Sequence, residues 1–121
     1  MKVGREATKI WEGDAAQLRA VDIGGYRGSQ FSAERVPTLA EALATCKGRC
    51  RVVVELKSYG HNQQLEERVV AIVEAAGMEG DCIFMSLDHE MMRKLKALRP
   101  SWRVGLLVAK AMGDLTQLKA D

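Results

Sequence analysis

From residue 37 onward the sequence alternates between helical and strand patterns, with a glycine or proline near most of the changes. Three short apolar runs predict buried strands over residues 51–58, 82–87 and 103–109. A segment with apolar residues at helical spacing precedes each run. Repeated units of this kind predict parallel strands joined by right-handed crossovers. The fold class is therefore α/β, with about three to four βα units.

Each predicted helix of this region has recognisable start and stop residues. A side chain that can cap the first turn precedes each apolar stripe, and a glycine or proline follows it. The starts are Thr38 (with Glu41 completing a capping box), Asn62 and Asp88, and the stops are Gly48, Gly77 and Pro100. Asp14 opens a short helix in the less regular N-terminal third, and Gly113-Asp114 opens another near the C-terminus.

The first predicted strand ends in two charged residues, Glu55 and Lys57. Residues two apart point to the same face of a strand, so a carboxylate and an ammonium project side by side from its C-terminal end. In parallel α/β proteins ligands and catalytic groups collect at that end. A buried ion pair, or a strand end that opens into water, explains the same pattern.

The two faces of the strands differ in polarity. Val52, Val54 and Leu56 form a wholly apolar face that suits packing against helices, whereas Val53, Glu55 and Lys57 suit a barrel interior that is polar at its mouth. In the third strand Val104, Leu106 and Val108 are expected to meet the helices, and Gly105, Leu107 and Ala109 to face the interior. A flat sheet covered on both faces fits the same pattern.

Composition narrows the class of protein. The 121 residues carry 18 Lys plus Arg against 16 Asp plus Glu, for a net charge of +2. The length fits one domain over residues 1–121. The charge balance argues neither for nor against a nucleic-acid surface, but no run of Lys and Arg with interleaved aromatic residues appears, and we expect no nucleic-acid partner. No apolar stretch approaches the roughly 20 residues of a transmembrane segment. Met1–Glu6 lacks the apolar core of a signal peptide, so we expect a soluble, cytoplasmic protein.

The cysteines and glycines exclude two further kinds of site. Cys46, Cys50 and Cys82 cannot all pair, and His61 and His89 are the only histidines, so reduced cysteines are favoured over a disulfide framework or a zinc site. The loop around residues 24–28 lacks the glycine fingerprint of a dinucleotide site.

Several segments resemble the glycerophosphodiester phosphodiesterase family in order and spacing. They are Arg35–Leu43 (RVPTLAEAL), Val53–Lys57 (VVELK) and Met85–Leu87 (MSL). Tyr59–Gln63 and Arg99–Leu107 are similar to the bacterial membrane-associated branch of that family. The resemblance covers nearly the whole chain and corresponds to the central portion of the family's domain.

The resemblance implies a partial (β/α)8 TIM barrel that hydrolyses a glycerophosphodiester to an alcohol and glycerol 3-phosphate with the help of Ca2+ or Mg2+. The family's metal-binding glutamate matches Glu55, and the lysine near the substrate phosphate matches Lys57. Carboxylate oxygens suit a hard cation, and an ammonium complements a phosphate. His61 and Ser86 are candidates for the substrate mouth, although a solvated loop histidine fits His61 as well.

The chain departs from the family at its ends. The family's opening His-Arg-Gly motif, its Glu-x-Thr segment and its His-Asp pair have no match here, and neither His61 nor His89 takes the place of a family histidine. A full barrel needs roughly 250 residues. We therefore expect the chain to begin after those motifs, to end before the last strands, and to show little or no diesterase activity when isolated.

A partial barrel also predicts self-association. Open strand edges and one uncovered sheet face favour a homodimer of two half-barrels. Val53, Phe84 and Leu107 are expected on the uncovered side.

Two other functions remain open from the residues. A non-catalytic α/β module could associate with partners or bind phosphate-bearing ligands through Lys57. In an unrelated α/β protein, Glu55 and Lys57 would merely pair with each other.

Overall fold

The computed structural model describes residues 9–109, and the chain divides into two compact units, Met1–Thr38 and Leu39–Asp121. The single domain predicted over residues 1–121 stays a prediction. The helix predicted at Gly113-Asp114 lies outside the described residues. Among the described residues no helix is both long and apolar enough to cross a membrane.

The first unit contains the short helix α1 (Ala15–Ala20) and a 3-10 turn, η1 (Ser29–Phe31). Asp14 caps α1 as predicted, because its carboxylate accepts a hydrogen bond from the Gln17 amide at 2.8 Å and the Gln17 side chain accepts one from the Asp14 amide at 3.0 Å. Val21 is the single buried apolar side chain among the described residues of this unit.

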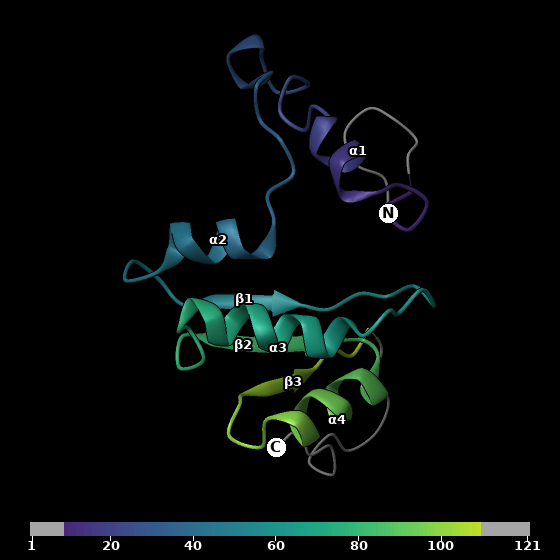
Figure 1. Cartoon of the computed structure of the whole chain (residues 1–121), viewed down its shortest axis with the longest axis vertical. Helices are drawn as coiled ribbons and strands as arrows, with labels where there is room; N and C mark the ends of the chain where they lie inside the picture. The colour runs from purple at the N-terminus through teal and green to yellow at the C-terminus, as the bar shows by residue number, and fades with distance from the viewer. Residues whose placement is uncertain (1–8, 110–121) are drawn as a thin grey trace. The chain divides into compact units, whose positions relative to one another are not determined.

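The second unit is built on a parallel sheet of β1 (Val52–Glu55), β2 (Cys82–Ser86) and β3 (Val104–Leu106), in the order β1-β2-β3 (Figure 1). The three predicted strands and their parallel direction are confirmed, although each is shorter than predicted. The register places Val54 beside Phe84 and Phe84 beside Val104.

Three helices connect and cover the strands: α2 (Leu39–Cys46), α3 (Leu65–Ala76) and α4 (His89–Leu98) (Figure 1). Their predicted ends are largely confirmed. The side chains of Asn62 and Asp88 accept hydrogen bonds from first-turn amides of α3 and α4, at 2.9 and 3.1 Å. Gly77 ends α3 with a φ of 60°, a conformation that glycine adopts without steric cost. Helix α2 begins directly after Thr38, while its capping box stays a prediction.

One apolar core lies between the helices and a single face of the sheet. Its buried members come from all three helices, from β2 and β3 and from the loops, and they include Leu43, Leu56, Val73, Phe84, Leu95 and Trp102. Val52 and Val54 pack against this core, as do Val104 and Leu106, as their parity predicts. Val108 is 47% exposed, so its predicted contact with the helices is wrong; β3 ends at Leu106, and the alternation does not extend beyond it.

The predicted position of Phe84 on the uncovered side is also wrong. Paired residues of neighbouring parallel strands share a face, and Phe84 pairs with Val54 and Val104, which both belong to the helix-packed side. The Phe84 side chain is fully buried, and its ring stacks on Trp102 with 4.7 Å between ring centroids and 13° between the planes.

The opposite face of the sheet is not covered by any helix of the second unit's described residues. Val53, which β1 contributes to this face, is 55% exposed. The neighbouring Ile83 and Met85 are half-buried. The alternation predicted for β1 is therefore confirmed, with an apolar packed face and an exposed face that ends in charge.

Candidate functional site

Glu55 and Lys57 lie together at the C-terminal end of β1, on the uncovered face. The Lys57 ammonium nitrogen is 3.0 Å from Oε2 of Glu55, and the two side chains are 42% and 36% exposed. The hydrogen bond to Glu55 is the largest cause of a raised Lys57 pKa, so the lysine keeps its positive charge. An ion pair this exposed contributes little to the stability of the fold. Because both side chains are partly exposed, a ligand can reach them.

A cation site needs more oxygen ligands than one copy of this arrangement supplies. No group of three or more Asp, Glu, His or Cys side chains that could hold a metal ion occurs within residues 9–109. Ca2+ takes six to eight oxygen ligands, while Mg2+ is held by one or two carboxylates together with water and substrate phosphate. Glu55 is thus one suitable ligand, but it does not form a metal cage.

The loop after Lys57 has an unusual backbone. Tyr59 and Gln64 are the only residues other than glycine with positive φ between residues 9 and 109, at 48° and 58°. The His61 amide donates a hydrogen bond to the Ser58 carbonyl at 2.8 Å, which closes a tight turn. Such backbone conformations cost free energy and concentrate near functional sites. The predicted mouth residue His61 lies in this loop and is exposed.

Ser86 lies at the same end of the sheet, but its side chain does not reach the uncovered face. It is 3% exposed. Its hydroxyl donates to the Leu56 carbonyl at 2.8 Å and accepts from the Asp88 amide at 3.0 Å. Ser86 therefore joins the end of β1 to the start of α4, and the geometry assigns it a structural role.

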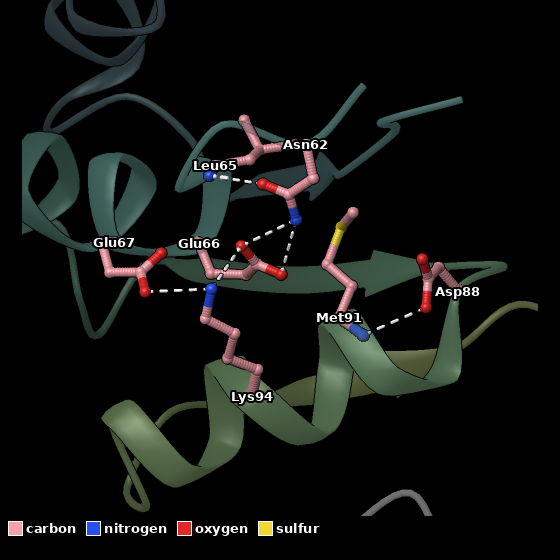
Figure 2. Close-up of polar contacts among 7 residues, drawn as sticks. All are labelled: Asn62, Leu65, Glu66, Glu67, Asp88, Met91 and Lys94. Atoms are coloured by element: carbon pink, nitrogen blue, oxygen red, sulfur yellow. Dashed lines mark hydrogen bonds and ion pairs between the residues drawn. The ribbon is translucent and has the colours of Figure 1, made fainter. Parts of the chain in front are cut away.

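A buried carboxylate that the sequence reasoning missed anchors the same loop (Figure 2). Glu66 is 2% exposed. The Asn62 amide donates to both of its oxygens at 3.0 Å, and the Lys94 ammonium lies 3.2 Å from Oε2. Asn62 also accepts a hydrogen bond from the Leu65 amide, although the N-cap residue of α3 is Gln64. The Glu66 carboxylate on α3 therefore links the loop, through Asn62, to Lys94 on α4.

Lys94 is shared with a second carboxylate. Its nitrogen is 2.9 Å from Oε1 of Glu67, and this hydrogen bond is the largest cause of a raised Lys94 pKa and of a lowered Glu67 pKa. A signal for the buried glutamate exists in the sequence, because Glu66 precedes the buried Val69, Val70 and Val73 by three, four and seven residues, which places it on the packed side of the helix.

The fold defines a class: a run of βα units with parallel strands and polar residues at their C-terminal ends, which is an arc of a βα barrel. No family model matches the chain. It is 26% identical over 106 residues to YhdW of Bacillus subtilis, provisionally named a glycerophosphodiester phosphodiesterase, covering 86% of this chain and 44% of the relative. A glycerophosphodiester phosphodiesterase of Caldanaerobacter subterraneus is 28% identical over 93 residues, covering 75% and 38%.

Solved structures lead to the same family. A glycerophosphodiester phosphodiesterase from Agrobacterium tumefaciens superimposes with a TM-score of 0.74 at 25% identity, over 85% of this chain and 42% of that one. A protein from Galdieria sulphuraria that is provisionally given the same name has a TM-score of 0.70 at 22% identity, over 84% and 39%, and supports the fold.

These comparisons confirm the resemblance to the glycerophosphodiester phosphodiesterases and are consistent with a partial domain and a partial TIM barrel. The chain spans less than half the length of the curated relatives it matches.

Proposed function

We propose that this chain carries part of a glycerophosphodiester site, with Glu55 as a ligand of Ca2+ or Mg2+ and Lys57 as the partner of the substrate phosphate. The observation that carries the proposal is the Glu55–Lys57 pair, with 3.0 Å between the two charged groups, on the uncovered face at the C-terminal end of a parallel sheet. Ligands bind at this end in βα barrels. The relatives' names supply the substrate class.

The pair has a simple role in binding. In the free chain the two charges neutralise each other across water-accessible surface. A phosphodiester offers Lys57 an anionic oxygen, and a divalent cation offers Glu55 a positive partner. Each side chain can therefore leave its ion-pair partner and bind a ligand of the opposite charge. Lys57 would then stabilise the additional negative charge that develops on the phosphate oxygens during hydrolysis.

We propose that one isolated copy binds such ligands but hydrolyses them slowly or not at all. Hydrolysis needs a group that activates water and a group that protonates the leaving alcohol. The hydroxyl of Ser86 is committed to Leu56 and Asp88. The described residues also offer no cluster of carboxylates around Glu55.

The direct test combines binding and turnover. Glycerophosphocholine with added Mg2+ or Ca2+ should raise the thermal midpoint of the wild type, and this shift should disappear in Glu55→Gln and in Lys57→Gln. Glu79→Gln, at an exposed glutamate in the turn before β2, serves as the control and should keep the shift. Turnover that Glu55→Gln abolishes would contradict the incomplete site, and no shift with any ligand would contradict the proposed function.

A second candidate is a non-catalytic module that binds phosphate-bearing ligands through Lys57. It is favoured because no group of three or more metal-binding side chains occurs within residues 9–109. Stabilisation by glycerol 3-phosphate that is independent of added cation and lost in Lys57→Gln would select this function over the first. The homodimer and the cytoplasmic location expected from the sequence also stay proposals; the free thiols of Cys46, Cys50 and Cys82 fit a reducing compartment.

A further inference from the structure

Glu66 is a buried charge at the base of the loop of residues 58–64, which connects Lys57 to α3. Its side chain is 2% exposed and lies on the packed side of the helix. Burying a charge is costly unless the charge is paired and hydrogen-bonded. The Lys94 ammonium lies 3.2 Å from Oε2, and the Asn62 amide donates to both carboxylate oxygens at 3.0 Å (Figure 2). One partner therefore comes from α4 and the other from the loop.

The stability of the fold does not require a charge at this position. An apolar side chain here would extend the row of buried valines on α3. Apolar packing is often as stable as a buried ion pair, and Lys94 would keep Glu67 as a partner at 2.9 Å. What the carboxylate adds is direction, because two hydrogen bonds hold the Asn62 amide in one orientation.

The loop needs a fixed point because its backbone is strained. Tyr59, Gly60 and Gln64 have positive φ values of 48°, 83° and 58°. A residue with a Cβ atom adopts such values at a cost in free energy and keeps them where surrounding contacts hold it. Asn62 lies between these residues, and its side chain also accepts a hydrogen bond from the Leu65 amide at 2.9 Å. The contact with the buried carboxylate therefore fixes the loop close to its strained residues.

We propose that Glu66 is a positioning residue of the candidate site. Its carboxylate, held by Lys94, fixes Asn62, and Asn62 fixes the loop in the conformation that forms one side of the ligand-binding surface beside Lys57. The inference rests on the proposed function, in which a phosphodiester binds to Lys57. Glu66 itself is too deeply buried to touch the ligand, so it acts on the affinity of the site through the loop.

The loop is placed to contact a ligand that is bound at Lys57. It leaves β1 at the C-terminal end of the strand and turns back into α3 (Figure 1). Tyr59 is 55% exposed and His61 is exposed, two and four residues after Lys57. A phenol ring and an imidazole offer apolar surface and hydrogen bonds to the ester groups on either side of the phosphate. A loop that is already ordered loses less conformational entropy on binding, which raises the affinity.

Glu66→Leu separates positioning from stability. Leucine keeps the buried surface of α3 apolar and removes both hydrogen bonds to Asn62, so the variant should stay folded, as measured by urea denaturation. Titration calorimetry with glycerophosphocholine and Mg2+ or Ca2+ should give a dissociation constant about tenfold higher than that of the wild type. Asn62→Ala, at an exposed residue, removes the same contact from the loop side and should have a similar effect. Glu66→Gln, which keeps one oxygen for Asn62, should give a smaller rise.

Hydrogen exchange measures the loop without any ligand. The His61 amide donates to the Ser58 carbonyl at 2.8 Å. Its exchange should be about tenfold faster in Glu66→Leu and in Asn62→Ala than in the wild type, because the turn is then free to open. The Val73 amide is the internal reference, since it lies inside α3 and its exchange reports on unfolding of that helix.

Glu67→Gln is the matched control. It removes the neighbouring carboxylate, which also pairs with Lys94, and leaves the contact between Glu66 and Asn62 in place. Both the dissociation constant and the exchange of the His61 amide should stay at their wild-type values.

Three results would overturn the inference: wild-type affinity for glycerophosphocholine in a folded Glu66→Leu or in Asn62→Ala, an equal loss of affinity in Glu67→Gln, or exchange of the His61 amide that neither loop variant accelerates. The proposed function fails separately. A wild type that binds no glycerophosphocholine refutes the function, and exchange of the His61 amide then decides whether Glu66 fixes the loop.

Discussion

The buried hydroxyl of Ser86 joins two elements of the second unit. The hydroxyl accepts a hydrogen bond from the amide of Asp88, the residue before α4, and donates one to the carbonyl of Leu56, the residue after β1. Ser86→Ala removes both bonds and leaves buried backbone groups unpaired, so we expect a loss of about 1–3 kcal/mol in the free energy of unfolding, measured by urea denaturation. Ser101→Ala, at an exposed serine, should change it by less than about 0.5 kcal/mol. Equal effects of the two substitutions would contradict the structural role.

Phe84 is the residue whose position most depends on the register. Phe84→Ala removes a fully buried ring and its stack on Trp102, so we expect a loss of about 3–5 kcal/mol in the free energy of unfolding. The control is Phe31→Ala, because Phe31 is 44% exposed. Urea midpoints measure both. A small effect at Phe84 would contradict its burial in the core and would favour the uncovered side of the sheet, as expected from the sequence.

These residues show where sequence reasoning stops. Charge at residues 55 and 57 indicates which face of β1 does not pack against the helices. The run Cys82–Met85 is apolar at every position, so its alternation cannot say which side chains meet the helices. Pairing with β1 decides it, and pairing is a property of the folded sheet. Glu66 was missed for a related reason: its partner Lys94 is 28 residues away.

At the level of elements, local signals predict well what local physics determines. Asp14, Gly77 and Asp88 act at the ends of helices as predicted, because capping involves only a few neighbouring residues. Asn62 accepts a hydrogen bond from the first amide of α3, but the N-cap residue is Gln64. Strand lengths were overestimated, since a strand extends only as far as its neighbour pairs with it. The attachment of α3 to α4 through Glu67–Lys94 and Glu74–Arg99 joins distant residues and could not be predicted from spacing.

The attachment of α3 to α4 should depend on pH. Hydrogen bonds from Lys94 and Arg99 lower the pKa values of Glu67 and Glu74 below their ordinary value of 4.5. A carboxyl group whose pKa falls on folding stabilises the fold above its unfolded pKa, and this stabilisation is lost as the pH falls through the lower, folded value. We therefore expect urea midpoints to fall as the pH drops below about 4.5.

Arg99→Gln tests which pair is responsible for this pH dependence. Arg99 Nη2 donates to Oε2 of Glu74 at 2.9 Å, so its removal should make the acid dependence of the urea midpoint less steep. The matched control is Arg93→Gln, because the Arg93–Glu90 pair on α4 is 77% and 79% exposed and should contribute little. An acid dependence unchanged in Arg99→Gln would exclude Glu74 as its source.

At the level of the whole molecule, the two units differ in how much apolar surface each one buries to stabilise its own fold. Every buried member of the core cluster lies between Leu43 and Val104. Among its described residues the first unit buries one apolar side chain, Val21. Burying one such side chain contributes roughly 1.5–3 kcal/mol, whereas ordering the backbone costs about 1–2 kcal/mol for every residue. The described residues of the first unit therefore cannot offset their own ordering by hydrophobic burial, while the second unit has a core of its own.

A fragment of residues 39–121 should consequently unfold cooperatively, with a urea midpoint close to that of the full chain. A peptide of residues 1–38 should show no cooperative transition, because one buried valine does not stabilise a fold. Circular dichroism followed through urea denaturation measures both. If the fragment of residues 39–121 is unfolded while the full chain is folded, contacts from the first unit are essential to the core.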